Sequence, residues 1–172
     1  MRVVRIIFGY LVAATVFALA IPAGVIALGR GVDAAFHLPR LIGGPINDCV
    51  TVLLAAWGAW WMLWSYWFLV ARGRGHPAEA FGIEVSPVTQ QLVTDGPYAH
   101  TRNPMVYGYF HVVLAIAAAY GSVGMVAAIA ALAVVGWVNL VFFEEPRLER
   151  RFGEGYREYK RRVPRFLPLG RR

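Results

Sequence analysis

Two groups of polar residues interrupt an otherwise apolar chain, and the first of them closes a loop. His100, Arg102 and Asn103 come directly before Pro104, and a long apolar segment follows. Proline suits the first turn of a helix, whose N-terminus offers free N–H groups and a positive dipole to a carboxylate or phosphate. Arg102 can bind an anion with two parallel hydrogen bonds, although a lipid headgroup contact explains it equally simply. Asn103 is expected to N-cap the helix.

The second polar group is an adjacent pair of carboxylates, Glu144 and Glu145, at the end of another apolar segment. The negative end of a helix dipole disfavours carboxylates by up to ~1 kcal/mol, and burial costs more unless they meet a cation. Two interpretations stay open. The pair marks the membrane edge or pairs with Arg102 and Arg147, or it forms part of a ligand site. A zwitterionic ligand with a carboxylate, an ammonium group and another cation would suit both polar groups together.

Several other residues are weaker candidates for chemistry. His111 lies inside an apolar segment, where an ionisable group is a functional candidate, but a neutral imidazole bonded to a neighbouring helix is the favoured interpretation. The four histidines are scattered and Cys49 is the only cysteine, so no metal site is predicted. Five tryptophans recur at helical spacing on one predicted face, where packing or interfacial anchoring is favoured over a ligand pocket; they are Trp57, Trp60, Trp61, Trp64 and Trp67.

The elements that must position these residues are membrane helices. The chain of 172 residues is 58% hydrophobic with mean hydropathy +0.52, above the 45–50% usual for soluble domains. Because a bilayer core needs about 20 helical residues, the apolar blocks predict spans at 4–28, 48–71, 104–120 and 123–143. The predicted fold is an all-α integral membrane protein with one domain over 1–172, comprising an N-terminal helix pair (1–71) and a second part (72–172). No strand precedes a Gly-rich turn, which excludes a Rossmann nucleotide site.

The connections carry further expectations. Pro22 should kink the first helix, and 29–47 should form an outside loop. Residues 72–103 should fold as a lid, because seven apolar residues there need burial, namely Phe81, Ile83, Val85, Val88, Leu92, Val93 and Tyr98. The last two spans should form a hairpin around residues 120–122. Pro146 should disfavour α conformation at Glu145 and begin one amphipathic helix on the membrane interface, ended by Pro164 and Pro168.

Basic residues indicate the orientation. Of the 17 Lys and Arg residues, two precede or begin the first span, three lie in 72–103 and ten follow the last span. With four crossings these 15 share one side, which the positive-inside rule makes cytoplasmic, together with both termini. A basic tail beside a membrane rests more often on anionic lipids than on nucleic acid, so membrane lipids are the expected partners and nucleic acid is not. The sequence carries no signal for the oligomeric state.

Two segments resemble the signature blocks of a family of membrane methyltransferases. LVTDGPYAHTRNPMVYG, residues 92–108, resembles its "GPY…R-(H/N)-P-M-Y" block, and EEPRLERRFGEGYREYKRRVPRFLP, residues 144–168, is similar to its second block. That family includes isoprenylcysteine carboxyl methyltransferases, phospholipid N-methyltransferases and small bacterial relatives. The resemblance covers roughly residues 72–168. Asn103 stands where many relatives have histidine, and Tyr107 stands one position later than the family tyrosine.

The resemblance implies S-adenosylmethionine as the methyl donor, bound at the cytoplasmic end of the last helices and covered by the loop and the C-terminal helix. It implies that cofactor-binding residues are Gly96, Pro97, Tyr98, Arg102, Asn103, Pro104, Tyr107, Glu144 and Glu145, with main-chain contacts near Val93 and His100. Arg102 and Glu145 are the expected catalytic residues. Arg102 would hold a carboxylate acceptor, whereas Glu145 or His100 would assist an acceptor that must lose a proton.

The function expected from these implications is S-adenosylmethionine-dependent methylation of a lipid or other apolar small molecule. Carboxylate, amine, thiol and hydroxyl acceptors stay open. Two rival functions remain beside it. One is an NADPH-dependent reductase, because sterol reductases share a related C-terminal membrane fold. The other is a non-enzymatic scaffold whose basic tail binds lipid.

Overall fold

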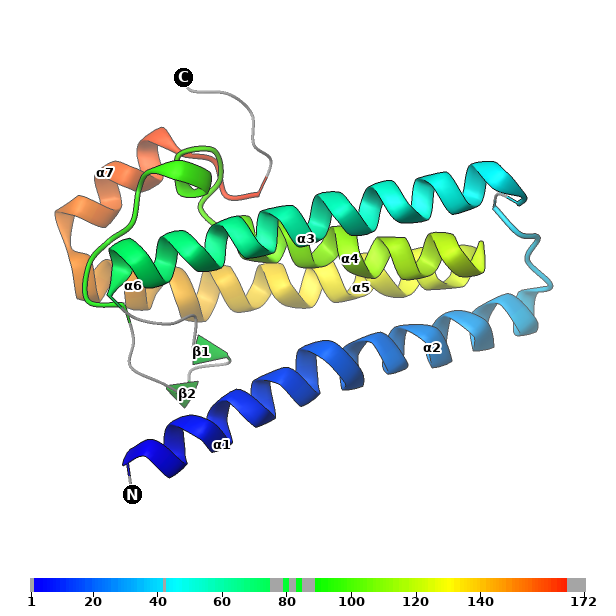
Figure 1. The fold of residues 1–172 in the computed structure, drawn as a ribbon, viewed down its shortest axis with the longest axis horizontal. Coiled ribbons are helices and arrows are strands. Elements are labelled where there is room, and N and C mark those ends of the chain that lie inside the picture. The colour runs from blue at the N-terminus through cyan, green and yellow to red at the C-terminus, as the bar shows by residue number, and fades with distance from the viewer. Residues whose placement is uncertain (1, 42, 75–78, 81–82, 85–88, 167–172) are drawn as a thin grey trace.

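The computed structural model describes residues 2–41, 43–74, 79–80, 83–84 and 89–166. Three helices lie side by side, namely α3 (Pro45–Gly73), α4 (Pro104–Tyr120) and α5 (Val123–Asn139), and one long N-terminal helical segment runs obliquely beside them (Figure 1). That segment comprises α1 (Arg2–Thr15), the π-helical turn η1 (Val16–Ala20) and α2 (Ile21–Phe36). In the part of the chain that is described, the only strands are β1 (Glu79–Ala80) and β2 (Ile83–Glu84), paired antiparallel. The predicted helical fold is therefore confirmed.

Three helical segments are long and apolar enough to cross a membrane: residues 7–36, 45–73 and 123–152. The chain is accordingly an integral membrane protein. The segment predicted as a further span, α4, is apolar but has only 17 residues. The π-helical turn η1 ends at Ala20, two residues before Pro22, whose nitrogen cannot donate the usual helical hydrogen bond. The expected disturbance at Pro22 therefore takes the form of a π-turn within a continuous helix.

The N-terminal helix is longer than its sequence pattern indicates. Residues 29–36 were expected in a loop, but α2 continues to Phe36 and only 37–44 connect it to α3. The glycine that suggests a loop, Gly29, instead permits close packing, since a Cβ there would lie 2.3 Å from Cγ of Met125. Beside it, Asp33 accepts a 2.7 Å hydrogen bond from the Gly124 N–H and another from the Ser122 hydroxyl. These contacts stabilise the additional helical turns.

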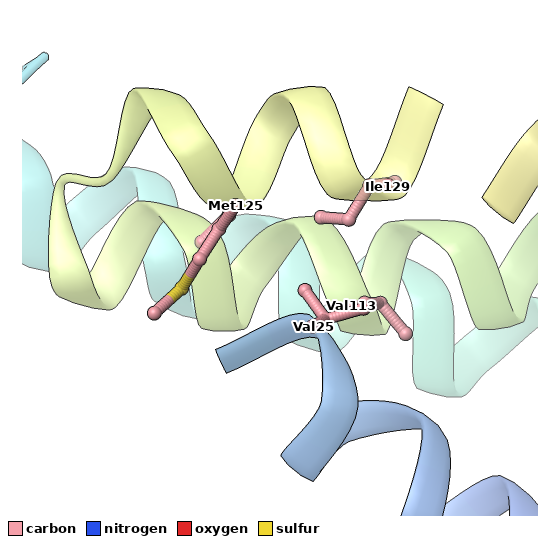
Figure 2. Packing of buried hydrophobic residues seen from close by; sticks show 5 residues of the cluster. Val25, Val113, Met125 and Ile129 are labelled. Atoms are coloured by element: carbon pink, nitrogen blue, oxygen red, sulfur yellow. The ribbon is translucent and has the colours of Figure 1, made fainter. Parts of the chain in front are cut away.

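The apolar core joins α2, α4 and α5. Figure 2 shows Val25 of α2 beside Val113 of α4, with Met125 and Ile129 of α5 across from them. Met125 and Val113 are fully buried. The predicted turn between α4 and α5 is confirmed: Gly121 has φ 60°, and the Ser122 hydroxyl accepts from the Met125 N–H at 2.9 Å.

The most extensive helix packing is between α3 and α4. It depends on two facing glycines, because a Cβ on Gly58 would lie 2.6 Å from the Gly108 carbonyl oxygen and one on Gly108 would lie 2.7 Å from that of Gly58. Side-chain-free backbones can approach this closely, which is the usual arrangement of small residues at membrane helix contacts. The contact holds the first turns of α4 against the middle of α3.

The C-terminal region differs from the single amphipathic helix that was expected. The helix of α5 continues through the π-turn η3 (Leu140–Glu144) into α6 (Glu145–Phe152), and α7 (Glu154–Arg162) follows. Gly153, at φ 58° and ψ −132°, separates α6 from α7. The expectation that Pro146 disfavours α conformation at Glu145 was wrong, since Glu145 is helical at φ −59° and ψ −43°. The wider π-turn before it accommodates the missing N–H of proline.

The polar segments gather at one end of the bundle, where α3 ends, α4 begins and α6 and α7 lie (Figure 1). We call this the loop end. At the opposite end, the Leu41 N–H donates to the Gly121 carbonyl at 2.9 Å, so the α4–α5 turn lies beside the α2–α3 connection. Of the residues expected to be buried in the 72–103 lid, Val93 is buried and Leu92 and Tyr98 are half-buried. Phe81, Val85, Val88 and the Ile83 side chain lie outside the described part.

Candidate functional site

A buried carboxylate surrounded by three cations forms the centre of the loop end. Glu145 is 4% exposed. It accepts hydrogen bonds from Nε and Nη2 of Arg165, at 2.8 and 3.0 Å, one on each carboxylate oxygen. Nη1 of Arg102 lies 2.7 Å from Oε1, and Nζ of Lys160 lies 3.8 Å from Oε2. Glu149 also holds Lys160, at 3.0 Å.

Arg102 is the most deeply buried of these cations, with 8% of its side chain exposed. Its contact with Glu145 is close but is not aligned as a hydrogen bond. Neither Nε nor Nη1 of Arg102 has a hydrogen-bond partner among the described residues. Buried donors of this kind are costly unless an acceptor meets them. The arrangement therefore suits an additional oxyanion at Arg102.

The two adjacent glutamates occupy different surroundings. Glu145 is buried within the ion cluster, whereas Glu144 is half-buried and ends the π-turn η3. Burial raises the pKa of the Tyr98 phenol above its usual value, and the negative charge of Glu144 raises it further. Glu144 thus faces the loop at Tyr98 while Glu145 faces Arg102. Within the first of the two interpretations, Glu145 is a buried partner of Arg102 and not a solvated charge at the membrane edge.

The loop before α4 has a defined conformation. Gly96 begins the 3-10 turn η2 (Gly96–Ala99) at φ 56°, and a Cβ there would lie 2.3 Å from Cε1 of Phe68. Only glycine satisfies both the left-handed backbone and this contact. Pro97 is fully buried. The Thr101 hydroxyl accepts from the Asn103 N–H at 3.3 Å, so the loop reaches α4 in a fixed geometry.

A C-terminal strap, which we define as Pro164 and Arg165, crosses this loop. The Pro164 carbonyl accepts from the Arg102 N–H at 2.9 Å. The Arg165 carbonyl accepts from the Thr101 hydroxyl at 2.9 Å and from Nδ2 of Asn103 at 3.0 Å. Asn103 does stand at the N-cap position of α4, but its side chain makes no capping hydrogen bond there. The expected cap was wrong because the amide binds the strap instead.

Two tyrosines of α7 fasten that helix to the same loop. The Tyr159 hydroxyl donates to the Tyr98 carbonyl at 2.7 Å, and the rings of Tyr156 and Tyr159 lie 6.0 Å apart. Burial raises the pKa of Tyr156 to about 12, with the charge of Glu145 adding to the rise and the charge of Arg102 opposing it. The tyrosine face expected on the membrane interface is therefore buried within the protein.

Aromatic rings line the other side of the loop. Trp61 lies at the centre of this aromatic cluster, with ring centroids 5.5 Å from Trp64, 5.1 Å from Tyr107 and 6.3 Å from His100. Nδ1 of His111 lies 2.8 Å from the Tyr107 carbonyl oxygen of the preceding turn, so its polar contact is within α4 and not with another helix as was favoured.

The five tryptophans of the expected stripe do not share one environment. Trp61 is buried, whereas the exposed fractions of Trp57, Trp60 and Trp67 are 48%, 60% and 60%. Only Trp61 and Trp64 contact His100. The stripe is thus divided between a packed part and an exposed flank of α3.

The structure divides the expected site residues between these two sides of the loop. Tyr98, Arg102, Asn103, Glu144 and Glu145 lie on the α6–α7 side, while His100 and Tyr107 turn toward α3. Val93 is buried against Gly73, Gly96 and Pro97 form the turn, and Pro104 begins α4. Within the described residues, no group of three or more His, Cys, Asp or Glu side chains is placed to hold a metal ion.

Sequence reasoning missed four residues of this region: Thr101, Lys160, Arg165 and the buried role of Trp61. Thr101 is completely buried. Arg165 lies in the second resembling block, so a sequence signal for it was present. That block does not show that the C-terminal strap folds back onto a carboxylate 20 residues earlier in the chain. The Thr101 and Asn103 contacts go to a main-chain carbonyl, which any residue supplies.

Comparison with known proteins assigns this chain to a family. No curated protein and no solved structure matches the chain. The family model for phospholipid methyltransferases matches residues 47–155, well over half of the chain. The match begins near the start of α3 and extends into α7, and it includes the loop, both glutamates and the aromatic cluster. This integral membrane protein therefore belongs to the phospholipid methyltransferase family.

Proposed function

We propose that this protein transfers a methyl group from S-adenosylmethionine to a lipid or other apolar molecule at the cytoplasmic face of a membrane. The observation that carries the proposal is the buried Glu145–Arg102 pair beside the N-terminus of α4, at the end of a membrane bundle. Family membership supports methyl transfer and a lipid acceptor. The donor, the site residues and the orientation are the parts that need testing.

The residues at the loop end fit the donor's charged groups. S-adenosylmethionine carries a carboxylate, an ammonium group and a sulfonium. Within the described part of the chain, Nε and Nη1 of Arg102 have no hydrogen-bond partner, although Nη1 lies 2.7 Å from Glu145, and this suits the carboxylate. Glu145 and Glu144 offer negative charge to the cationic groups. The first turn of α4, opened by Pro104, adds free N–H groups and a positive dipole.

The remaining proposed cofactor contacts come from the loop. Tyr98 and His100 lie at the end of η2, and Asn103 lies at the start of α4. The buried residues Val93, Pro97 and Pro104 with Gly96 shape the backbone that would contact the cofactor. Tyr107 has the weakest claim, because its ring packs on Trp61 and His111, away from Glu145.

When bound, S-adenosylmethionine supplies an electrophilic methyl carbon on a sulfonium sulfur, and this chain's residues need only align the acceptor and exclude water. Arg102 would orient an anionic group, and Glu145 would hold Arg102 in place while balancing positive charge. The strap covers the loop at Thr101, Arg102 and Asn103. It is therefore positioned to shield bound cofactor from solvent.

The arrangement of the ends supports four crossings. The helix α4 starts at the loop end, and its last residues lie beside the α2–α3 connection through the Leu41–Gly121 hydrogen bond. A helix that joins both ends of the bundle crosses the same distance as its neighbours, and its 17 residues would extend about 25 Å. With α1 also starting at the loop end (Figure 1), both termini share the basic side, which the positive-inside rule makes cytoplasmic. We keep the proposed division of the single domain into 1–71 and 72–172, with the proposed cofactor site in the second part.

Calorimetric titration of the detergent-purified protein tests the proposal directly. We expect micromolar binding of S-adenosylhomocysteine and no binding of NADPH. Glu144→Ala and Glu145→Ala should each weaken binding, whereas Glu154→Ala, in an exposed ion pair of α7, should not. No binding of either sulfur compound by folded protein would refute the proposal. Binding of NADPH instead would favour the reductase, and unchanged affinity in both glutamate variants would remove those residues from the site.

A further inference from the structure

The N-terminal helical segment is anchored in its second half and exposed in its first. In α2, Val25 is buried in the apolar core, and Asp33 accepts a hydrogen bond from the Gly124 N–H at 2.7 Å. In α1, by contrast, the exposed fractions of Ile7 and Leu11 are 55% and 62%. The π-turn η1 joins the two halves. The direction of α1 therefore depends on what holds this turn.

The π-turn contains a carbonyl that its own helix does not satisfy. In a π-helix each N–H donates to the carbonyl five residues earlier, and the Ile21 N–H does so to Val16. The next donor in this pattern would be Pro22, opposite the Phe17 carbonyl, but proline has no N–H. Phe17 lies near the middle of the 7–36 span, where hydrocarbon offers no donor. The Phe17 carbonyl therefore needs a donor from another helix.

That donor is Tyr109 of α4. Its hydroxyl donates to the Phe17 carbonyl at 2.8 Å. The two rings also meet edge to face, with centroids 5.5 Å apart and planes at 88°. Tyr109 lies in the second turn of α4, five residues after Pro104. The hydrogen bond thus ties the π-turn of the first span to the helix that begins at the polar loop.

The same order of π-turn and proline recurs in the last span. There the Glu145 N–H donates to the Leu140 carbonyl across η3, and Pro146 follows directly. Prolines and π-turns are the usual places at which long helices bend. In both spans, then, the chain combines a π-turn, one further residue and a proline. This recurrence indicates that the turn before Pro22 is a feature of how the chain bends its long spans.

We propose that residues 17–22 form a hinge about which α1 pivots, and that the Tyr109 hydroxyl holds this hinge in one position. The hinge is independent of the proposed methyl transfer. When Tyr109 donates, the Phe17 carbonyl is satisfied and α1 has one preferred direction. When it does not, that carbonyl takes another donor and the bend changes. Because α2 stays anchored through Val25 and Asp33, the change is confined to α1, which begins at the loop end (Figure 1).

The size of the movement follows from helix geometry. Ile7 lies ten residues before Phe17, which is about 15 Å along a helix that rises 1.5 Å per residue. A change of about 20° in the bend, typical of a helix kink, would then move Ile7 by about 5 Å. A displacement of this size is measurable between two spin labels.

The first experiment measures distances between pairs of nitroxide labels by double electron–electron resonance, on the full chain in lipid nanodiscs. The free cysteine is removed by Cys49→Ser. One pair, Ile7→Cys with Leu63→Cys, reports α1 against α3. The other pair, Leu28→Cys with Leu53→Cys, reports the anchored α2 against the same helix. All four labelled positions are exposed, so the labels displace no packed side chain.

The hinge predicts different results for the two pairs. Tyr109→Phe, which removes only the hydroxyl, should shift or broaden the α1–α3 distance by about 5 Å and leave the α2–α3 distance unchanged. The matched control Tyr120→Phe, at the other end of α4, should change neither distance. An unchanged α1–α3 distance in Tyr109→Phe would overturn the inference. Equal changes in both pairs would overturn it as well, because the whole segment would then have moved.

The second experiment tests whether the missing N–H of Pro22 is the reason that the hinge needs Tyr109. Pro22→Ala restores a donor for the Phe17 carbonyl, so Tyr109→Phe should have no further effect on the α1–α3 distance in that background. In thermal unfolding, Tyr109→Phe should lower the Tm of the parent protein by about 2–4 °C, as expected for one hydrogen bond, and should lower that of Pro22→Ala by less. Equal effects of Tyr109→Phe in the two backgrounds would refute the hinge.

Discussion

Removing the charge of Glu145 should destabilise the fold strongly, because its carboxylate compensates a buried cation. In Glu145→Gln, Arg102 would keep its positive charge with only 8% of its side chain exposed. Breaking a buried ion pair in this way costs about 3–5 kcal/mol. At about 2–4 °C per kcal/mol for a chain of this size, the expected loss in Tm is roughly 6–20 °C. Arg165 would also lose its partner but is more exposed, and Lys160 would keep its contact with Glu149.

Thermal unfolding in detergent, followed by circular dichroism, measures this effect. The informative variants are Glu145→Gln, Arg102→Met and the double variant. Because a buried ion pair replaced entirely by neutral groups is often nearly neutral in stability, the double variant should be much more stable than the sum of the single losses indicates. The control is Glu154→Gln, in an ion pair on the exposed surface of α7, which should leave Tm unchanged.

Two outcomes would contradict this reasoning. If Glu145→Gln and Glu154→Gln had the same Tm as the parent protein, Glu145 would not be compensating a buried charge. If the losses of the two single variants simply added in the double variant, Glu145 and Arg102 would not interact energetically. Either result would also remove the ion cluster as the structural basis of the proposed cofactor site.

Three further predictions concern backbone contacts and pH. Gly96→Ala should cost more than about 1 kcal/mol in the free energy of unfolding, because φ 56° disfavours other residues and the new methyl would overlap Phe68; an unchanged denaturation midpoint would contradict this. Gly108→Ala should lower the free energy of unfolding by about 1–3 kcal/mol, because the new methyl group would separate α3 from α4. The matched control is Gly136→Ala, whose nearest new contact is 3.9 Å away. Equal losses of stability in the two variants would refute the close approach of α3 and α4. Burial raises the pKa of Tyr156 to about 12, above an unfolded value near 10. The stability that this tyrosine contributes is therefore complete below about pH 10 and is lost as the pH rises toward 12. Tyr156→Phe should move the midpoint of alkaline unfolding to higher pH, and an unmoved midpoint would exclude Tyr156 as the cause of that unfolding.

The sequence predicts those features that depend on apolar length and on short-range rules. Uncharged blocks locate the cores of α3, α4 and α5, and Gly121 with Ser122 locates the turn between the last two. The end of α2 was misplaced because glycine serves two purposes that sequence alone does not distinguish. At Gly29 it permits contact with Met125 inside a helix, whereas at Gly153 it separates two helices by its positive φ.

The sequence predicts which residues belong to the candidate site better than it predicts the contacts that they make. The two resembling blocks contain Arg102 and Glu145, which the structure brings to 2.7 Å. The His100 and Arg102 side chains go to opposite sides of Thr101, whose hydroxyl binds a strap carbonyl 64 residues later in the chain. The Asn103 amide had two suitable partners, the α4 backbone and the Arg165 carbonyl, and only the tertiary structure selects between them.

The anchoring of α2 on α5 has a consequence for the order in which this protein assembles during synthesis. Asp33 is bound by the N–H of Gly124, 91 residues later, and Gly29 packs on Met125. The first hydrophobic segment therefore enters the bilayer long before its partner leaves the ribosome, and it must wait there as a solitary helix. By contrast, α3 and α4 meet as soon as the loop between them is made. The part matched by the family model can thus form its nucleus first, with the N-terminal helix docking onto it last.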